Sequence, residues 1–258
     1  MNTKRVFNQL TQRTHMPFYN DGMLIFCTNE SVASRKVNRQ LRVAGPTEAD
    51  YRPWKLAVAE WTNKTITPID VGMPDDAILC NPTFHQDGKE LHVSFVAGVP
   101  FEDGVSYHLY EMTGDSWQNL TSPQQVGNEA AKTGFVSPVY YCLGGEHQLT
   151  LLDRRNHDRF RLMTSLREIS RAIYDPERPP RLLITGINVW GEYVTLMFDM
   201  ETQEVTEIHG PAPAYKACLI GDRILFSYRE SDEVEDYQIH IAPATFEPSS
   251  ETVEVVKI

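Results

Sequence analysis

The expected fold is decided by one stretch of the chain, residues Asn81–Phe95, which read NPTFHQDGKELHVSF. A proline and an aromatic residue come first, an Asp-Gly pair follows, and a segment that mixes apolar and polar residues completes the stretch. Asp-Gly between two such segments indicates a β-hairpin, because the tight turn needs a positive φ that glycine adopts without steric cost. The stretch therefore predicts a strand, a turn and a second strand.

The same order of features recurs along the chain. It is found at Pro17–Phe26, Pro138–Leu152 and Pro213–Phe226, and in weaker form at Ala172–Ile184. Further β-branched and aromatic segments between the copies supply two more short strands per unit. Repeats spaced by tens of residues indicate a repeat architecture, and four antiparallel strands per unit are the composition of a propeller blade.

We therefore predict an all-β fold, a β-propeller with five blades of four antiparallel strands. The copies are unevenly spaced, so six blades are the alternative if the long first unit is two, and blades three and four are expected to be irregular. Segments 4–10 and 251–258 each predict a strand. We expect the N- and C-terminal strands to pair and close the ring, which removes an exposed sheet edge; the alternative is two frayed ends.

The quoted stretch, with its Pro-x-aromatic, its Asp87-Gly88-Lys89 turn and its apolar strand, resembles the repeat of TolB-like propellers. The likeness is strong in this copy and weakens in the others, which lack the lysine after the turn glycine. The resemblance implies the propeller fold and a tendency to bind other proteins. It does not imply an enzymatic activity.

Composition sets the class of protein. The chain has 258 residues, 41% of them hydrophobic, and no Pro/Gly/Ser-rich linker divides it, so we expect one domain over 1–258. No apolar run approaches the roughly 18 residues of a membrane span, and no apolar segment follows the N-terminus. We therefore expect no membrane insertion, no classical secretion, and a cytoplasmic or virion location. The net charge of −11 argues against nucleic-acid partners.

Two basic groups interrupt this acidic composition. One is Arg154, Arg155, Arg159 and Arg161, and the other is Arg35, Lys36 and Arg39 in the polar stretch 29–50. We expect them to be the contact elements for an acidic partner. The alternative for the first group is a solvated hairpin whose arginines pair with Asp153 and Asp158.

Motifs of enzyme chemistry are not evident. The four cysteines form no C-x-x-C pair and are expected to be buried and reduced. The eight histidines show no metal-ligand spacing, and we predict no cofactor and no metal, although a site assembled across blades stays open. The residues that lead into the inner strands, where propeller glycosidases place their carboxylates, are His15, Asn81, Ser137 and Arg171 with their neighbours, none of them acidic.

Two functions follow as hypotheses. The first is a non-enzymatic protein-interaction or structural subunit of a larger assembly or homo-oligomer, such as a bacteriophage virion or tail component, because propellers commonly serve as rigid docking platforms. The alternative is a glycan-binding or glycoside-hydrolase-like propeller, since tyrosines and tryptophans offer stacking surfaces for sugars. Carboxylates converging on the channel mouth would favour the second function.

Overall fold

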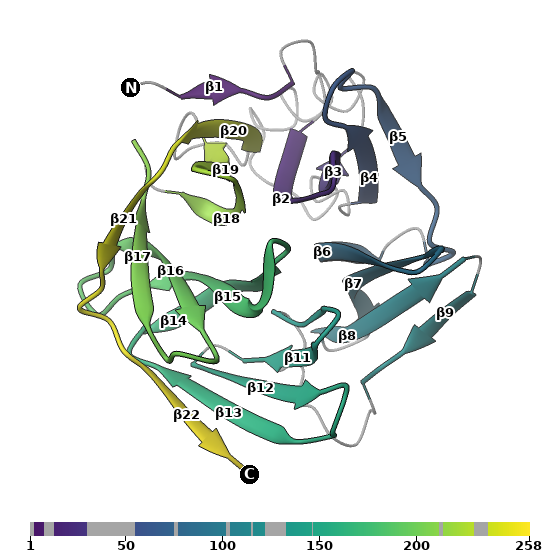
Figure 1. The fold of residues 1–258 in the computed structure, drawn as a ribbon. Helices are drawn as coiled ribbons and strands as arrows, with labels where there is room; N and C mark the ends of the chain where they lie inside the picture. The colour runs from purple at the N-terminus through teal and green to yellow at the C-terminus, as the bar shows by residue number, and fades with distance from the viewer. Residues whose placement is uncertain are drawn as a thin grey trace.

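The computed structural model describes residues 3–7, 13–29, 55–74, 77–101, 104–114, 116–121, 133–145, 147–211, 214–229 and 237–258. In these residues the regular elements are all β-strands, as predicted. No helix in them has the length and apolarity to cross a bilayer. The strands form five small antiparallel sheets arranged in a ring, so the chain is a five-bladed β-propeller (Figure 1).

Each blade is a sheet that starts at the channel and runs outward, and we number the blades in chain order. Blade 1 contains β2 (Arg13–Asn20), β3 (Met23–Asn29), β4 (Lys55–Glu60) and β5 (Ile66–Ile69). Blade 2 contains β6 (Ile78–Asp87), β7 (Glu90–Phe101), β8 (Gly104–Thr113) and β9 (Ser116–Asn119).

The remaining blades take strands from both ends of the chain. Blade 3 contains β10 (Phe135–Val136), β11 (Tyr140–Gly144), β12 (Gln148–Asp153), β13 (Arg159–Thr164) and β22 (Val253–Lys257). Blade 4 contains β14 (Glu168–Asp175), β15 (Arg178–Ile187), β16 (Tyr193–Asp199), β17 (Val205–His209) and β21 (Thr245–Pro248). Blade 5 contains β18 (Tyr215–Ile220), β19 (Arg223–Arg229), β20 (Tyr237–Pro243) and β1 (Lys4–Arg5).

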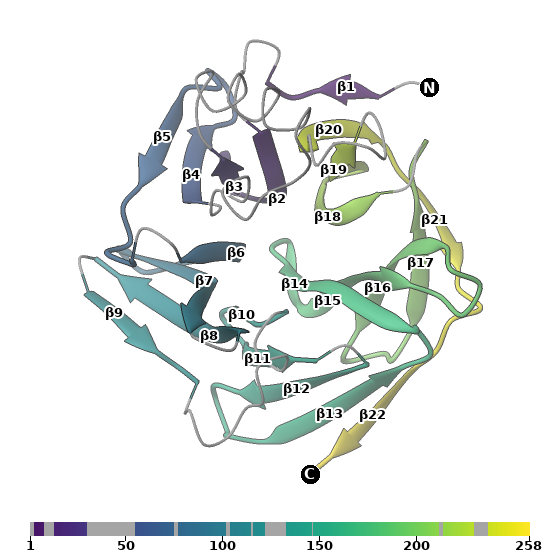
Figure 2. The same cartoon turned by 180° about the vertical axis from the view of Figure 1, so that it is seen from behind.

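The ring closes at blade 5, but not by pairing of the two terminal strands. β1 pairs with β20, so the N-terminal strand completes the last blade as expected. The C-terminal strand β22 instead pairs with β13 on the far side of the ring, which the view from behind also shows (Figure 2). The prediction that the N- and C-terminal strands pair with each other was therefore wrong, because β1 pairs with β20 and β22 pairs with β13. After β20 the chain continues past blade 4 as β21, so its end reaches the outer edge of blade 3.

The repeated hairpins are the two innermost strands in four blades. The copies around Phe18, Phe84, Tyr174 and Tyr215 form β2–β3, β6–β7, β14–β15 and β18–β19. The copy that begins at Pro138 lies one strand farther out, because the two-residue strand β10 precedes it at the channel. The expected irregularity of blades 3 and 4 takes the form of a fifth strand in each.

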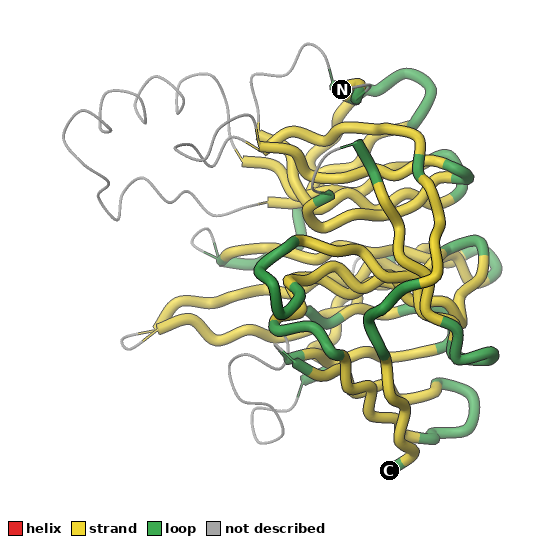
Figure 3. Tube along the Cα trace, turned by 90° about the vertical axis from the view of Figure 1, so that its left-hand side faces the viewer, coloured by secondary structure: helices red, strands yellow, loops and turns green. Residues whose placement is uncertain are grey.

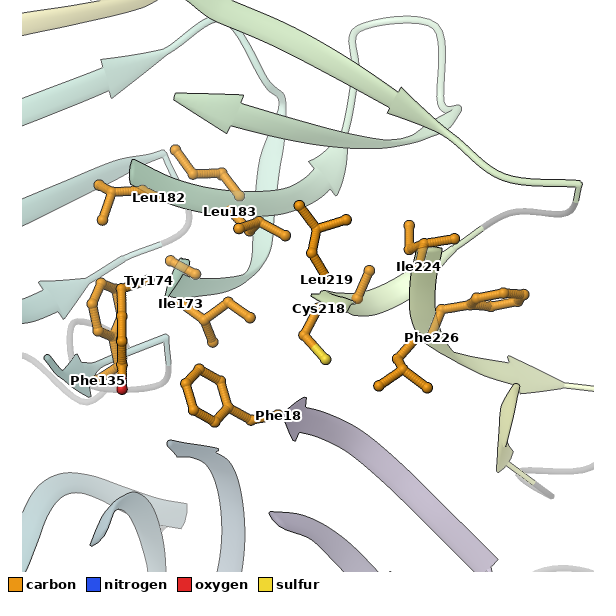
Figure 4. Close-up of a cluster of buried hydrophobic side chains, with 14 of the residues drawn as sticks. Phe18, Phe135, Ile173, Tyr174, Leu182, Leu183, Cys218, Leu219, Ile224 and Phe226 are labelled. Carbon is orange, nitrogen blue, oxygen red and sulfur yellow. The ribbon is translucent and has the colours of Figure 1, made fainter. Parts of the chain in front are cut away.

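A continuous apolar core joins the blades around the channel. Phe18 lies edge-on to Phe84, with ring centroids 5.6 Å apart, and Tyr174 lies 5.1 Å from Phe18. Figure 4 shows how Phe18, Phe135, Ile173 and Tyr174 from three blades converge in this cluster. All four cysteines are buried and free, as predicted. Burial of the apolar side chains of this core is the main favourable contribution to folding.

Candidate functional site: the channel and its mouth

The innermost strands share a backbone irregularity near their starts. The register shifts between His15 and Phe18 in β2, Cys80 and Thr83 in β6, Ile169 and Arg171 in β14, and Tyr215 and Cys218 in β18. Within three of these bulges, Met16, Asn81 and Lys216 have positive φ values of 53°, 48° and 51°. A β-bulge leaves backbone groups unpaired and redirects side chains. Here the redirected side chains and carbonyls gather in the channel.

Arg171 is the centre of this arrangement, although only 1% of its surface is exposed. Its Nε donates to Asn81 Oδ1 at 2.8 Å, and its Nη1 donates to the carbonyls of Pro17 at 2.8 Å and Lys216 at 2.6 Å. Its Nη2 donates to the carbonyl of Met16 at 3.3 Å. Burial lowers the pKa of Arg171 to about 10, so it stays charged at neutral pH.

Asn81 extends the same network to the remaining blade. Its Nδ2 donates to the carbonyl of Gly134, just before β10, at 2.7 Å and to that of Ala172 at 3.0 Å. Two side chains therefore link the inner strands of all five blades. Among the partners that the structure describes for Arg171 there is no carboxylate, so the channel keeps a positive charge at its centre.

A cavity of about 200 Å³ lies at the face of the ring where the inner strands begin. Its walls are built by His15, Thr133, Gly145, Glu168, Ile169, Ser170, Tyr193, Tyr215, Lys216 and Tyr237. These residues come from blades 1, 3, 4 and 5, so the cavity exists only in the closed ring. On the same face, β7 and β8 extend past the start of β6, and Figure 3 shows one pair of strands that projects beyond the others.

Aromatic rings line the cavity. The imidazole of His15 stacks on Tyr237 with centroids 4.2 Å apart, and Tyr193 meets Tyr215 edge-on at 4.2 Å. Burial, and then the charges of Lys216 and Arg171, hold the pKa of His15 well below its usual value. His15 is therefore neutral at pH 7. Among the described residues, the charged side chains of the cavity wall are Lys216 and Glu168, and the charge of Arg171 also acts on His15.

One wall residue carries an unsatisfied polar group. The Thr133 hydroxyl is buried, and no group in the part of the chain that the structure describes hydrogen-bonds it. Its position is tight, because a Cβ built on Gly144 would overlap this hydroxyl. A buried hydroxyl without a partner is uncommon in folded proteins, and this one keeps an unused donor.

The predicted contact arginines do not form one patch. Arg154 turns inward and donates to the carbonyl of Ser137 at 2.8 Å, and Arg155 pairs with Asp153 at 2.6 Å. Arg159 and Arg161 lie exposed on β13. Asp158, expected to pair with an arginine, pairs instead with Lys257 of β22 at 2.5 Å. The second basic group, Arg35, Lys36 and Arg39, lies outside the described residues.

Sequence reasoning identified the right positions in the channel but not the hydrogen-bond network that they form there. His15, Asn81 and Arg171 were noted as residues that lead into the inner strands, and all three meet at the channel. They were examined for carboxylates only, so the network around Arg171 was missed. Glu168 and Lys216 were also missed, because the bulges that bring them to the cavity depend on backbone conformation.

Comparison with known proteins found no match to a family or a curated protein and distant likenesses among solved structures. No protein-family model and no curated protein matches the chain. Among solved structures, TolB from Acinetobacter baumannii is similar at 10% identity and a TM-score of 0.35, with 94% of this chain and 81% of that one covered. A mutant Trypanosoma rangeli sialidase that displays trans-sialidase activity is similar at 7% identity and a TM-score of 0.39. The alignment covers 90% of this chain and 54% of the sialidase.

Proposed function

We propose that this propeller is a non-enzymatic interaction module that holds an acidic segment of a protein partner at the mouth of its central channel. The observation that carries the proposal is this cavity, whose described wall holds one cation, Lys216, and one carboxylate, Glu168, and whose His15 also feels the buried charge of Arg171. In a molecule of net charge −11, a cationic centre with low-dielectric walls focuses the field on anions. The chemistry that fits is a carboxylate with hydrogen-bonding neighbours.

The polar groups of the wall suit such a ligand. The Thr133 hydroxyl has no hydrogen-bond partner among the described residues, and the tyrosines of the wall offer further hydroxyls. Tyrosine rings also present rigid contact area at low entropic cost. Glycosidic cleavage uses two carboxylates roughly 5–10 Å apart, whereas the described cavity wall supplies one. The wall is therefore better matched to binding than to hydrolysis.

The test is fluorescence anisotropy with labelled extended peptides of equal length that are rich in aspartate and glutamate, neutral, or rich in lysine. We expect the acidic peptide to bind best, and its affinity to fall as salt is raised. Lys216→Gln should weaken this binding about tenfold. The matched control is Lys89→Gln, which removes the same charge from the exposed β6–β7 turn at the other end of the inner strand.

Two results would count against the proposal: equal affinity for all three peptides, or equal loss in the two lysine variants. A second candidate function is sugar binding, which the three tyrosines of the cavity favour. A glycan array that includes neutral and carboxylate-bearing sugars separates the two. If a glycan binds, Tyr237→Ala abolishes that binding, and no peptide binds, the proposed ligand would be a carbohydrate and not a protein segment.

A further inference from the structure

A second polar cluster lies away from the cavity, where blade 2 faces blade 3. His85 on β6 is directly opposite His92 on β7, and Thr113 on β8 is opposite His92. Glu111 lies two residues before Thr113, so it shares their face of the sheet. The two imidazole rings stack with centroids 4.8 Å apart and planes inclined by 10°. His92 Nδ1 lies 3.2 Å from Glu111 Oε1.

These three side chains present the donor set of a transition-metal site. One ligand atom from each of His85, His92 and Glu111 lies within 4.8 Å of the others. Two imidazole nitrogens with one carboxylate oxygen suit Zn²⁺ and similar divalent ions. Bond lengths of about 2.0–2.1 Å place tetrahedral zinc ligands roughly 3.4 Å apart. Side-chain rotation that brings the three ligand atoms from within 4.8 Å to about this spacing would close the site.

A positive charge already lies against this donor set. Arg154 Nη1 lies 3.2 Å from His85 Nε2, and its Nη2 lies 3.7 Å from Glu111 Oε1. Because a guanidinium only donates, His85 Nε2 accepts, and its lone pair is directed at a cation. Burial, and then the charge of Arg154, lowers the pKa of His85 to about 4, so the ring is neutral at pH 7.

Arg154 also has anchors outside the cluster. It donates to the carbonyl of Ser137 at 2.8 Å, and its guanidinium lies 4.8 Å from the centre of the Tyr141 ring. It therefore keeps partners if it moves away from the imidazole and the carboxylate. We propose that His85, His92 and Glu111 form a binding site for a divalent ion of the zinc class, and that Arg154 competes with the ion for it.

The test is calorimetric titration of Zn²⁺ into chelator-stripped protein, with Co²⁺ absorption as a second measurement of the coordination geometry. We expect one ion per chain and a tetrahedral Co²⁺ spectrum. His92→Gln should weaken binding at least tenfold, and Arg154→Gln should tighten it about tenfold because the competing cation is gone. His147→Gln, which changes an exposed histidine, is the matched control and should bind as the parent does.

Failure to bind Zn²⁺ below about 1 mM, or equal binding by the parent and His92→Gln, would overturn the proposal. The cluster would then be a polar contact between blades only. Arg154→Gln keeps all three ligands, so it tests the site even if His92→Gln folds poorly. Weaker Zn²⁺ binding by Arg154→Gln would show that the arginine orients the ligands and does not compete, which also contradicts the proposal.

Discussion

At the scale of single residues, Arg171 stabilises the fold by hydrogen-bonding acceptors that stay buried in the channel when Arg171 is replaced. Arg171→Met takes away the donors of three carbonyls and of the Asn81 amide oxygen, and these acceptors stay in the channel. Each buried polar group left unpaired costs about 1–3 kcal/mol. We expect Arg171→Met to lower the free energy of unfolding by at least about 3 kcal/mol, measured by urea denaturation.

The control for this variant is Arg159→Met, which removes an exposed arginine from β13 and should change stability by less than about 0.5 kcal/mol. Asn81→Ala should destabilise as well, and the double variant should cost less than the sum of the two because they share one network. Full additivity would show that Arg171 and Asn81 act independently and would contradict the proposed link between blades.

Two buried histidines make stability depend on pH. The pKa of His85 is lowered to about 4, and that of His15 lies well below its usual value, chiefly through burial. Both are neutral in the folded protein, whereas the unfolded chain binds a proton on each below about pH 6.5. Stability therefore rises with pH in this range. For His85, the loss between pH 7 and pH 5 is about 2 kcal/mol.

The measurement is urea denaturation at pH 5 and pH 7 with a chelator present. His85→Gln and His15→Gln should each flatten this dependence, and His147→Gln, an exposed histidine, should leave it unchanged. An unchanged slope in both buried variants would mean that neither histidine is held neutral by the fold.

At the scale of elements, the C-terminal strand covers an edge without closing the ring. β22 pairs with β13 along Phe160 to Thr164, but most of its side chains are exposed. Removal of residues 250–258 should therefore cost only about 1–2 kcal/mol. It also exposes the hydrogen-bonding edge of β13, which favours edge-to-edge association. We expect a folded protein that self-associates in light scattering.

The edge explanation has its own check. Met163→Lys in the shortened chain places a charge on the uncovered strand and should restore the monomer. If the shortened protein unfolds, or stays monomeric without the lysine, β22 has a role other than edge protection.

Prediction from sequence worked for elements whose signals are local. The Asp87-Gly88 turn gave the hairpin β6–β7 and could also have given its register, because a tight turn at 88–89 pairs His85 with His92. That step would have brought the two histidines together from sequence alone. β10 was missed because two residues carry no period. The partner of β22 was missed because a terminal strand contains no information about which distant edge is free.

The same limit applies to the candidate site. Positive φ at Met16, Asn81 and Lys216 is unusual for residues other than glycine, so no sequence pattern predicted the bulges. Without them, the convergence of Arg171 with four other blades could not be predicted. The site is a property of the closed ring, whereas the repeat is a property of each blade.

At the scale of the whole molecule, this convergence predicts that the five blades unfold as one unit over 1–258. Each blade has its own sheet, so a repeat protein of this kind can lose cooperativity blade by blade. Here Arg171 and Asn81 bond to inner strands or their leading residues in every blade, and the apolar core is continuous across them. Loss of one blade therefore breaks the network of all five.

Tryptophans in different blades allow a direct measurement. Trp61 follows β4 in blade 1, Trp117 lies on β9 in blade 2, and Trp190 lies between β15 and β16 in blade 4. Variants in which one of these three is the only tryptophan, with Trp54 replaced as well, should show the same urea midpoint, which should also coincide with the far-ultraviolet circular dichroism transition. In the Arg171→Met background we expect the midpoints to separate. Separate midpoints with Arg171 intact would mean that only contacts between neighbouring blades hold the ring together. The channel network would then shape the binding site without coupling the unfolding of the blades.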